Sequence, residues 1–339
     1  MPFVSSNAAE SESAEEPSRS NAARSEERRG VALAFAAFLI WGLFPIYFDL
    51  LRDVPPLVTL AFRAVFTSVL LLPLVLWRGK GPAILATLRR PKYVVGLSIT
   101  MAATAASWGL FIWLIAVDRT LYCSLGNYIS PLANVVFGAL FLRERARFLS
   151  GVAIFLAFVG VAAFALGVGR LPWESVVVAA VFPIYSILRK AMDVDSTTAL
   201  TIETLFSLPI AAAYIVYAGY WGVSSRPAWA TDPYSLTLLV GAGALTAVPL
   251  LLFGSAARRA KLSTLGLLQY LTPTGQFLCG AFLFREPTTA YQWVSFAFVW
   301  VALVLFSVDL CRAEKSNRSD QEAEADADAT RSETPADSA

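Results

Sequence analysis

Three ionisable residues stand inside long apolar stretches of the sequence: Asp49, Arg63 and Glu203. A charge at the centre of a membrane helix costs about 2.5–3.5 kcal/mol, so such residues usually serve a function or face an opposite charge. Arg189 and Lys190, which come shortly before Glu203, are candidate basic partners. These five residues could gate or line a path for a substrate, with Arg63 paired with Asp49 in one closed state and Glu203 paired with Arg189 or Lys190 in the other. The alternatives are a static buried ion pair, or an Arg63 side chain that reaches toward the headgroups. These interpretations stay open. Arg63 and Glu203 are not expected to be each other's partner, because about a dozen ångströms of depth separate them.

Amides and prolines recur at helical spacing in two further stretches. Their intervals of four, three and four residues place each set on one face of a helix. Buried amides need partners in a membrane, so each face is expected to line a wet cavity or to bond a neighbouring helix. Each proline removes a backbone donor, which frees a carbonyl for a substrate or for bending. Packing around the glycines is the alternative. The two sets are Asn127, Pro131, Asn134 and Gly138, and Gln269, Pro273, Gln276 and Gly280.

Aromatic side chains accompany these polar residues. Inside the apolar stretches they could stack on a flat organic or amphiphilic substrate, or hold a cation over a ring. Near the ends of the stretches, four tryptophans are expected to anchor the chain at the membrane interface: Trp113, Trp173, Trp221 and Trp229. The aromatic candidates for a substrate cavity are Trp41, Tyr47, Trp108, Tyr128, Tyr185 and Tyr270.

The composition argues against most kinds of chemistry. Of the 339 residues, 57% are hydrophobic, 15% are charged and none is histidine. Soluble domains are about 45–50% apolar and about 25% charged, so a bilayer is the expected environment. The sequence has no P-loop and no nucleophile elbow, and we predict no catalytic residues, metal site, cofactor or nucleic-acid partner. Cys123, Cys279 and Cys311 lack metal or redox spacing and are expected to be isolated small apolar residues.

Apolar runs of membrane-spanning length fill the chain between Val31 and Leu310. A helix needs about 20 apolar residues to cross the hydrocarbon core. Lys and Arg are concentrated in alternate connections, which predicts that both termini are cytoplasmic. Residues 1–29 and 313–339 are polar and of low complexity, and are expected to be disordered cytoplasmic tails. The ten predicted spans are residues 31–51, 57–77, 92–117, 121–142, 148–168, 172–190, 198–221, 235–257, 264–284 and 290–310.

The second half of the sequence repeats the first. The quartet Phe-Pro-Ile-Tyr occurs at residues 44–47 and again at 182–185. The segment NYISPLANVVFGALFLRE, residues 127–144, aligns without a gap on QYLTPTGQFLCGAFLFRE, residues 269–286. This alignment equates Asn127 with Gln269 and Asn134 with Gln276. A further match, of Leu60-x-x-Arg63-x-x-Phe66 on Leu200-x-x-Glu203-x-x-Phe206, equates Arg63 with Glu203.

Residues 30–168 and 169–312 are therefore predicted to form two repeats of five spans each. An odd number of spans places the second repeat upside down relative to the first. Inverted repeats are typical of secondary transporters, because two similar halves can open a central site to each side in turn. Duplication without transport remains an alternative.

Longer segments resemble a known family. "WGLFPIYFDLL", "SLGNYISPLANVVFGALFLRER", "LPWESVVVAAVFPIYSILRK" and "STLGLLQYLTPTGQFL" resemble the RarD branch of the EamA-type transporters, within the drug/metabolite transporter superfamily. The resemblance covers residues 30–310 in unbroken order. It implies a bacterial inner-membrane protein with two five-helix repeats around a central cavity. Members are described as permeases, and the resemblance implies no particular substrate.

The sequence departs from this family's pattern in the second span. Val58 and Phe62 stand where relatives often carry the Glu and His of a Glu-x-x-x-His-Arg motif, and only Arg63 is retained. Near the end of the first span, Asp49 replaces a Lys. Because the chain has no histidine, a His-based proton relay is excluded. The coupling ion, with a proton as one candidate, stays open.

These observations predict an all-α integral membrane protein with ten helices in two inverted five-helix repeats. It would carry a small organic metabolite or drug by alternating access, as a permease or an exporter, across a bacterial cytoplasmic membrane. Its expected partners are this substrate and the lipid bilayer. An intramembrane enzyme, a lipid scramblase, and a receptor or scaffold that shares the duplicated fold are the alternatives.

Overall fold

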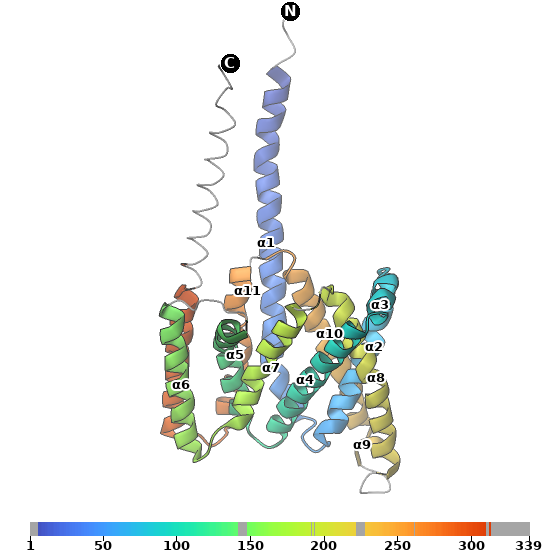
Figure 1. Cartoon of the computed structure of the whole chain (residues 1–339), viewed down its shortest axis with the longest axis vertical. Helices are drawn as coiled ribbons and strands as arrows, with labels where there is room; N and C mark the ends of the chain where they lie inside the picture. Colours follow the sequence, from blue (N-terminus) through green and yellow to red (C-terminus); the bar gives the residue numbers. More distant parts are fainter. Residues whose placement is uncertain are drawn as a thin grey trace, which may run out of the picture. The chain divides into compact units, whose positions relative to one another are not determined.

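The structure is a computed structural model, which describes residues 6–141, 148–190, 192, 194–221, 228–260, 262–309 and 312. Within these ranges all regular structure is helical, so the predicted all-α class is confirmed (Figure 1). The helices are α1 Ser6–Asp49, α2 Pro56–Trp77, α3 Gly81–Leu88, α4 Pro91–Ala116, α5 Thr120–Phe141, α6 Phe148–Val168, α7 Trp173–Lys190, α8 Ser196–Trp221, α9 Ala228–Thr231, α10 Pro233–Ala256, α11 Leu262–Leu268, α12 Leu271–Leu278, the π-helix η1 Cys279–Leu283, and a last helix, Ala290–Asp309.

Within the described ranges, seven helices are long and apolar enough to cross a membrane. Three further predicted spans coincide with α5, with α7, and with α11, α12 and η1 together, so the total of ten stays a prediction. The seven spans are Ser25–Asp49, Pro56–Trp77, Pro91–Ala116, Phe148–Val168, Thr197–Tyr220, Pro233–Ala256 and Ala290–Asp309.

The helix α1 extends further toward the N-terminus than its membrane span. It begins at Ser6 and passes through the tail for which composition predicts disorder, and only the backbone of residues 6–24 is described there. Only the part from Ser25 is apolar enough to cross a membrane. The polar tail has no apolar face to bury, so its composition supplies no packing reason for this extension.

Proline and aspartate mark the starts of the spanning helices. Pro56, Pro91 and Pro233 each occupy the first turn, where a missing N–H costs no helix hydrogen bond. Asp232 caps α10 by accepting hydrogen bonds from the backbone N–H of Tyr234 and of Ser235. A further hydrogen bond from the Ser235 hydroxyl is the main reason why the pKa of Asp232 lies below its usual value.

The predicted span 264–284 is not one uninterrupted helix, which corrects that prediction. The chain turns at Gln269 and Tyr270 between α11 and α12, and it widens into the π-helix η1 at Cys279. Pro273 explains the turn, because it has no N–H to bond the carbonyl of Gln269 four residues earlier. That carbonyl instead accepts a hydrogen bond from the N–H of Thr272, at 3.2 Å.

The helices fall into two compact units. Unit 1 comprises Met1–Asn134 and Pro172–Thr288, and unit 2 comprises Val135–Leu171 and Thr289–Ala339. In unit 2, α6 packs a face of small residues against the last helix. Phe164 meets Phe296 edge-on at 6.3 Å, and the Ser150 hydroxyl donates to the carboxylate of Asp309. Gly160 lies so close to the last helix that an added Cβ would stand 2.9 Å from Val299.

In unit 1, several helix contacts have counterparts that the predicted repeat would relate, whereas among the described contacts α2–α4 and α1–α4 have no counterpart of comparable extent. The repeat equates α1 with α7, α2 with α8, α4 with α10, and α5 with the segments α11 to η1. The helix pairs α2–α10 and α1–α10 have the counterparts α8–α4 and α7–α4. The pair α1–α12 has the counterpart α7–α5, where the Ser175 hydroxyl donates to the carbonyl of Tyr122. The pair α2–α8 maps onto itself. This is the contact pattern that two similar halves would produce.

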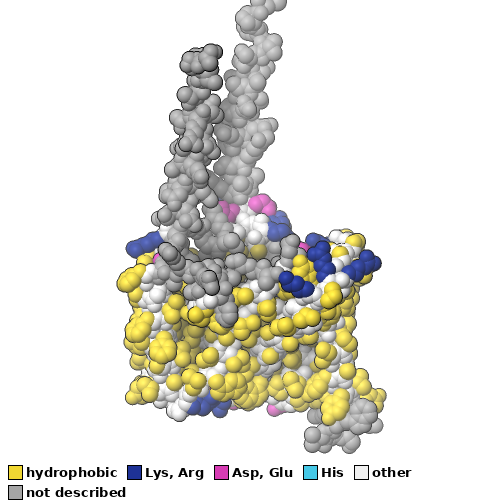
Figure 2. All heavy atoms as spheres, viewed as in Figure 1, with side chains coloured by type: hydrophobic (Ala, Val, Ile, Leu, Met, Phe, Trp, Pro, Cys, Tyr) yellow, Lys and Arg dark blue, Asp and Glu magenta, His cyan; other side chains and the backbone are white. Residues whose placement is uncertain are grey.

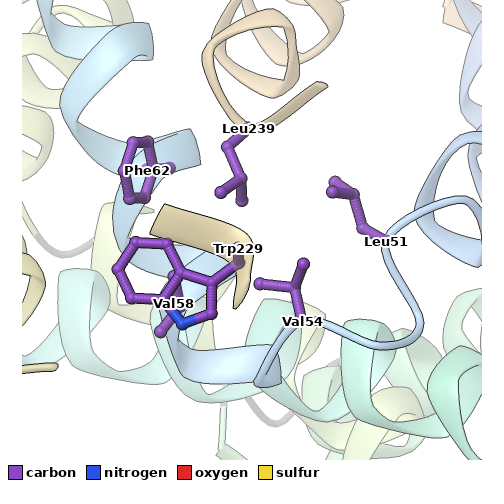
Figure 3. Packing of buried hydrophobic residues seen from close by; sticks show 6 residues of the cluster. All are labelled: Leu51, Val54, Val58, Phe62, Trp229 and Leu239. Atoms are coloured by element: carbon purple, nitrogen blue, oxygen red, sulfur yellow. The ribbon is translucent and has the colours of Figure 1, made fainter. Parts of the chain in front are cut away.

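One hydrophobic cluster of unit 1 joins the α1–α2 connection to α9 and α10 (Figure 3). Trp229 is buried in this cluster, edge-on to Phe62 at a ring distance of 5.9 Å. The expectation that Trp229 is an interfacial anchor is therefore wrong. The short helix α9 turns it inward, whereas Trp173 is exposed as expected. The cluster consists of Leu51, Val54, Val58, Phe62, Trp229 and Leu239.

Large hydrophobic side chains are exposed on the spanning helices, and they cover most of the face that Figure 2 shows. In unit 1, Ile99, Ile210 and Val216 are examples. Basic side chains lie instead at the edges of this face, and one group of them lies near α3. Exposed Arg78, Arg89 and Arg90 flank that short helix. An apolar belt with basic residues at its edge is the surface expected of a membrane protein.

Candidate functional site

The buried cation of unit 1 is Arg63, on α2. Its guanidinium lies over the indole of Trp108 on α4, 4.3 Å from the ring centroid, and the residue is only 8% exposed. Trp108 is itself held by Phe44 and Phe111, at ring distances of 5.7 and 5.5 Å. The predicted candidates Arg63 and Trp108 therefore come together, in an aromatic environment.

The expected partner of Arg63 is engaged elsewhere. Asp49 lies 3.5 Å from the guanidinium of Arg52, which also binds the carboxylate of Asp118 at 2.7 Å. These three residues are at least partly exposed at the ends of α1 and α4. Within the described ranges no carboxylate forms a salt bridge with Arg63, and its Nε is buried without a hydrogen-bond partner. The suggested pairing of Asp49 with Arg63 does not occur in this structure.

The buried anion Glu203, on α8, has partners. It is 5% exposed, and it accepts a hydrogen bond of 2.7 Å from the hydroxyl of Thr100 on α4. The guanidinium of Arg189 on α7 lies 3.8 Å from the carboxylate and 5.6 Å from the ring centre of Tyr185. Three helices thus bring together predicted residues of both signs. The side chain of Lys190 lies outside the described residues.

The two charged groups are separate sites. Both use α4: Thr100 contacts Glu203, and Trp108 contacts Arg63. Trp108 follows Thr100 by eight residues, which corresponds to about 12 Å along a helix axis. Arg63 and Glu203 are therefore not each other's partner, as the sequence led us to expect, although the repeat equates them.

The polar face of α5 contacts α12. The side-chain amide of Asn127 donates to the amide oxygen of Gln276 at 2.8 Å. At the next residue of α5, the hydroxyl of Tyr128 shares a hydrogen bond of 2.8 Å with that of Thr274 on α12. The first residues of α5 are buried throughout. The amide of Asn127 and the hydroxyl of Tyr128 therefore bond a neighbouring helix, which offsets the cost of placing these polar groups in a membrane.

The repeat predicts a second amide pair. Exchanging the two halves turns Asn127 into Gln269 and Gln276 into Asn134, so the counterpart of the pair Asn127–Gln276 is Asn134–Gln269. Both of these residues are half-buried, and in the described part of the chain no hydrogen bond joins them. One of two equivalent amide contacts is therefore made and the other is not.

Among the remaining candidates, Trp41 and Tyr47 pack against neighbouring helices, and for Pro131, Pro273 and Tyr270 the structure gives the degree of burial. Trp41 packs against Phe38 and Phe253 with tilted rings, at ring distances of 5.5 and 5.8 Å. Tyr47 donates its hydroxyl to the carbonyl of Leu238 on α10, at 2.6 Å. The structure does not bring these two residues to either charged group. Pro131 and Pro273 are buried, and Tyr270 is half-buried.

Two residues of this region were not identified from the sequence. Thr100 carries no signal, because a threonine in an apolar helix usually bonds its own backbone. Glu286 repeats Glu144 in the aligned segments, which could have identified it. Its buried carboxylate accepts hydrogen bonds from the backbone N–H groups of Thr120 and Leu121, and so caps α5. Burial raises the pKa of Glu286 above its usual value, although these hydrogen bonds oppose the shift.

The described residues contain no group of three His, Cys, Asp or Glu side chains placed to hold a metal ion. Cys123 and Cys279 are free and buried, and Cys311 lies outside the described residues. The site therefore contains three kinds of group: a cation beside an aromatic ring, a carboxylate that has hydrogen-bonding and basic partners, and a pair of amides that are hydrogen-bonded between two helices. These groups suit binding and conformational change.

Comparisons with known proteins agree with the sequence. The model of the EamA-like transporter family matches residues 28–166. An "Uncharacterized transporter" of Vibrio cholerae is 39% identical over 86% of this chain and 96% of its own length. "Protein RarD" of Escherichia coli is 37% identical over 84% of this chain and 95% of its own length.

A solved crystal structure of a protein shares the fold. It is 17% identical, with a TM-score of 0.53, and the match covers 85% of this chain and 99% of that one. An identity this low speaks for the fold alone. The relatives, which are 37% and 39% identical over nearly their whole length, decide the family. The chain is a multi-pass membrane protein that belongs to the EamA-like transporter family, among its RarD-type members.

Proposed function

We propose that this protein is a secondary-active transporter, which carries a small organic solute across a bacterial cytoplasmic membrane by alternating access between two inverted repeats. Relatives that are 39% and 38% identical are named uncharacterized transporters. The paired helix contacts of unit 1 support two similar halves. Within the described residues no nucleophile with an adjacent base is apparent, and the composition offers no histidine.

The observation that carries this proposal is the unequal state of the two amide pairs. Asn127 and Gln276 are hydrogen-bonded at 2.8 Å, whereas the equivalent residues Asn134 and Gln269 are not joined. Asn134 follows Asn127 by seven residues, about 10 Å along α5. A contact made at one level and absent at the equivalent level is what a repeat protein shows when it is closed on one side.

In the alternative conformation the roles of the two pairs would be exchanged. Asn134 would bond Gln269, and the contact between Asn127 and Gln276 would open. The two prolines lie between the levels, at Pro131 and Pro273. A helix bends most readily where a proline has removed a hydrogen bond, so these positions suit a hinge in each half.

Transport is tested with purified full-length protein in liposomes. The vesicles are incubated with a uniformly ¹³C-labelled extract of bacterial metabolites, and the vesicle contents are identified by mass spectrometry. We expect at least one organic solute to enter vesicles with protein and not empty vesicles. A cross-link then connects uptake to the amide pair. The variant Asn127→Cys/Gln276→Cys, in a background without native cysteines, should lose uptake on oxidation and regain it on reduction.

The control for the introduction of cysteines is the variant Ser124→Cys/Gln276→Cys. Its uptake is measured in the reduced state and compared with that of Asn127→Cys/Gln276→Cys. Two outcomes would contradict the proposal. Uptake that continues after complete oxidation would show that the contact need not open. Absence of any solute uptake, together with rapid movement of a fluorescent phospholipid between leaflets, would identify a scramblase.

A further inference from the structure

Arg63 differs from the other buried charges of the described residues. The four buried carboxylates each have a donor: Glu174 has Arg119, Glu203 has Thr100, Glu286 has two backbone N–H groups, and Asp309 has Ser150. The guanidinium of Arg63 has only the face of Trp108, and its Nε is buried without a partner. An ionisable side chain inside a membrane segment is by default a candidate functional site, and a buried cation without an ion pair has its charge available for a ligand.

We infer that Arg63 and Trp108 form the carboxylate-binding site for a small organic anion with an apolar or aromatic body. A guanidinium presents a planar fork of N–H donors, which matches the two oxygens of a carboxylate. The ring of Trp108 covers one face of this fork at 4.3 Å and so leaves its edge for a ligand.

The surroundings select the rest of the ligand. Phe44 and Phe111 lie against Trp108, at ring distances of 5.7 and 5.5 Å, and provide an apolar wall beside the cation. The buried carboxylate of Glu203, on α8, already has Thr100 and Arg189 as partners. Thr100 lies about 12 Å from Trp108 along the axis of α4, so Glu203 provides no site for an ammonium group on the same small molecule.

This inference depends on the proposed function only in calling the ligand a substrate. Binding is therefore measured without transport, on the full chain in detergent. The probes share one carbon skeleton and differ in charge: 3-phenylpropionate, 3-phenylpropanamide and 3-phenylpropylamine. A ligand that binds the folded state raises the unfolding temperature, and the stabilisation grows with the logarithm of one plus the ligand concentration divided by Kd. We expect the anion to bind about tenfold more tightly than the amide or the amine, as charge-assisted hydrogen bonds require.

The variants test each group. Arg63→Gln should abolish the preference for the anion, and Arg63→Lys should weaken it, because an ammonium lacks the fork. Trp108→Leu should reduce the preference for 3-phenylpropionate over propionate. The matched control is Arg90→Gln, which removes an exposed arginine that lies 5.4 Å from the ring centre of Tyr93. It should bind the anion as the wild type does.

Arg63→Gln is expected to fold, since it removes a charge that has no ionic partner to strand. If it does not, Arg63→Lys and Trp108→Leu still decide the question. Equal binding of the three probes, or full anion binding in Arg63→Lys and Arg63→Gln, would overturn the inference. So would stabilisation through Arg63 by phosphatidylglycerol and not by 3-phenylpropionate, which would identify a lipid phosphate. If the protein binds the anion but takes up no solute in liposomes, the proposed transport function is refuted and the binding site is not. If it takes up a solute but binds the three probes equally, the binding site is refuted and the transport function is not.

Discussion

Removing the amide contact between α5 and α12 should open that side of the protein by a predictable amount. Asn127 and Gln276 form a neutral hydrogen bond of 2.8 Å between two helices. Such bonds inside membrane proteins average about 0.6 kcal/mol, with a maximum of about 1.7. Since 1.4 kcal/mol corresponds to a factor of ten, Asn127→Ala should increase the open population about threefold, and at most about fifteenfold.

The native thiol of Cys279 is a suitable reporter of opening. It is 4% exposed, and it lies one helical turn beyond Gln276. In a background with Cys123→Ser and Cys311→Ser, a small maleimide reacts with Cys279 only when α12 separates from its neighbours. When reaction is slow, the labelling rate is proportional to the open population, so Asn127→Ala should raise that rate about threefold.

The matched control is Asn134→Ala, which removes the equivalent amide of the unmade pair. It should leave the labelling rate of Cys279 unchanged or lower it. The double variant Asn127→Ala/Gln276→Ala should not exceed either single variant, because both remove the same bond. The reasoning is refuted if Asn134→Ala accelerates labelling as much as Asn127→Ala, or if neither variant changes the rate.

Three further predictions concern packing and helix ends. Gly275→Leu should lower the yield of monodisperse protein on size exclusion, because a Cβ at this position would lie 2.8 Å from the Cα of Gly42. The control Gly266→Leu adds a side chain in open space and should leave this yield unchanged. Glu286→Ala should lower the unfolding temperature, because hydrogen bonds to a charged group stabilise by about 1.5–3 kcal/mol. Glu286→Gln keeps one acceptor and should lower the unfolding temperature less. Equal decreases in the two variants would contradict the role of Glu286 as a cap of α5. The pKa of Asp232 is lowered in the folded state, so its stabilisation is present above the unfolded value of about 3.9 and is lost as pH falls through the lower folded value. The unfolding temperatures of wild type and Asp232→Ala should therefore differ near neutral pH and converge in acid, and a difference that persists at pH below both values would refute this.

The sequence predicts the class of structure because a membrane leaves few choices. A backbone in lipid must bond within its own segment, so a long apolar run becomes a helix. For the same reason the all-helical class and the positions of α2, α4 and α10 follow from hydropathy alone. The alignment of 127–144 on 269–286 identified the amide residues, and the structure joins two of them, Asn127 and Gln276.

Other features depend on contacts that a hydropathy window does not contain. Thr100 reaches Glu203 across 103 positions of sequence, and Thr120 reaches Glu286 across 166. Such contacts depend on how each helix is rotated and shifted against its neighbours, which the packing of many side chains decides together. The break at Gln269 is an intermediate case, since Pro273 indicates a weak point without showing that a turn forms there.

The charged residues show the division most clearly. Their sequence positions showed by themselves that Asp49, Arg63, Arg189 and Glu203 are costly in lipid and need partners. Only the tertiary structure decided the partners. Asp49 forms an ion pair with Arg52, Glu203 forms an ion pair with Arg189, and Arg63 lies against Trp108. The reason is geometric, because sequence specifies which charge a side chain carries, whereas helix packing decides which charges come within reach.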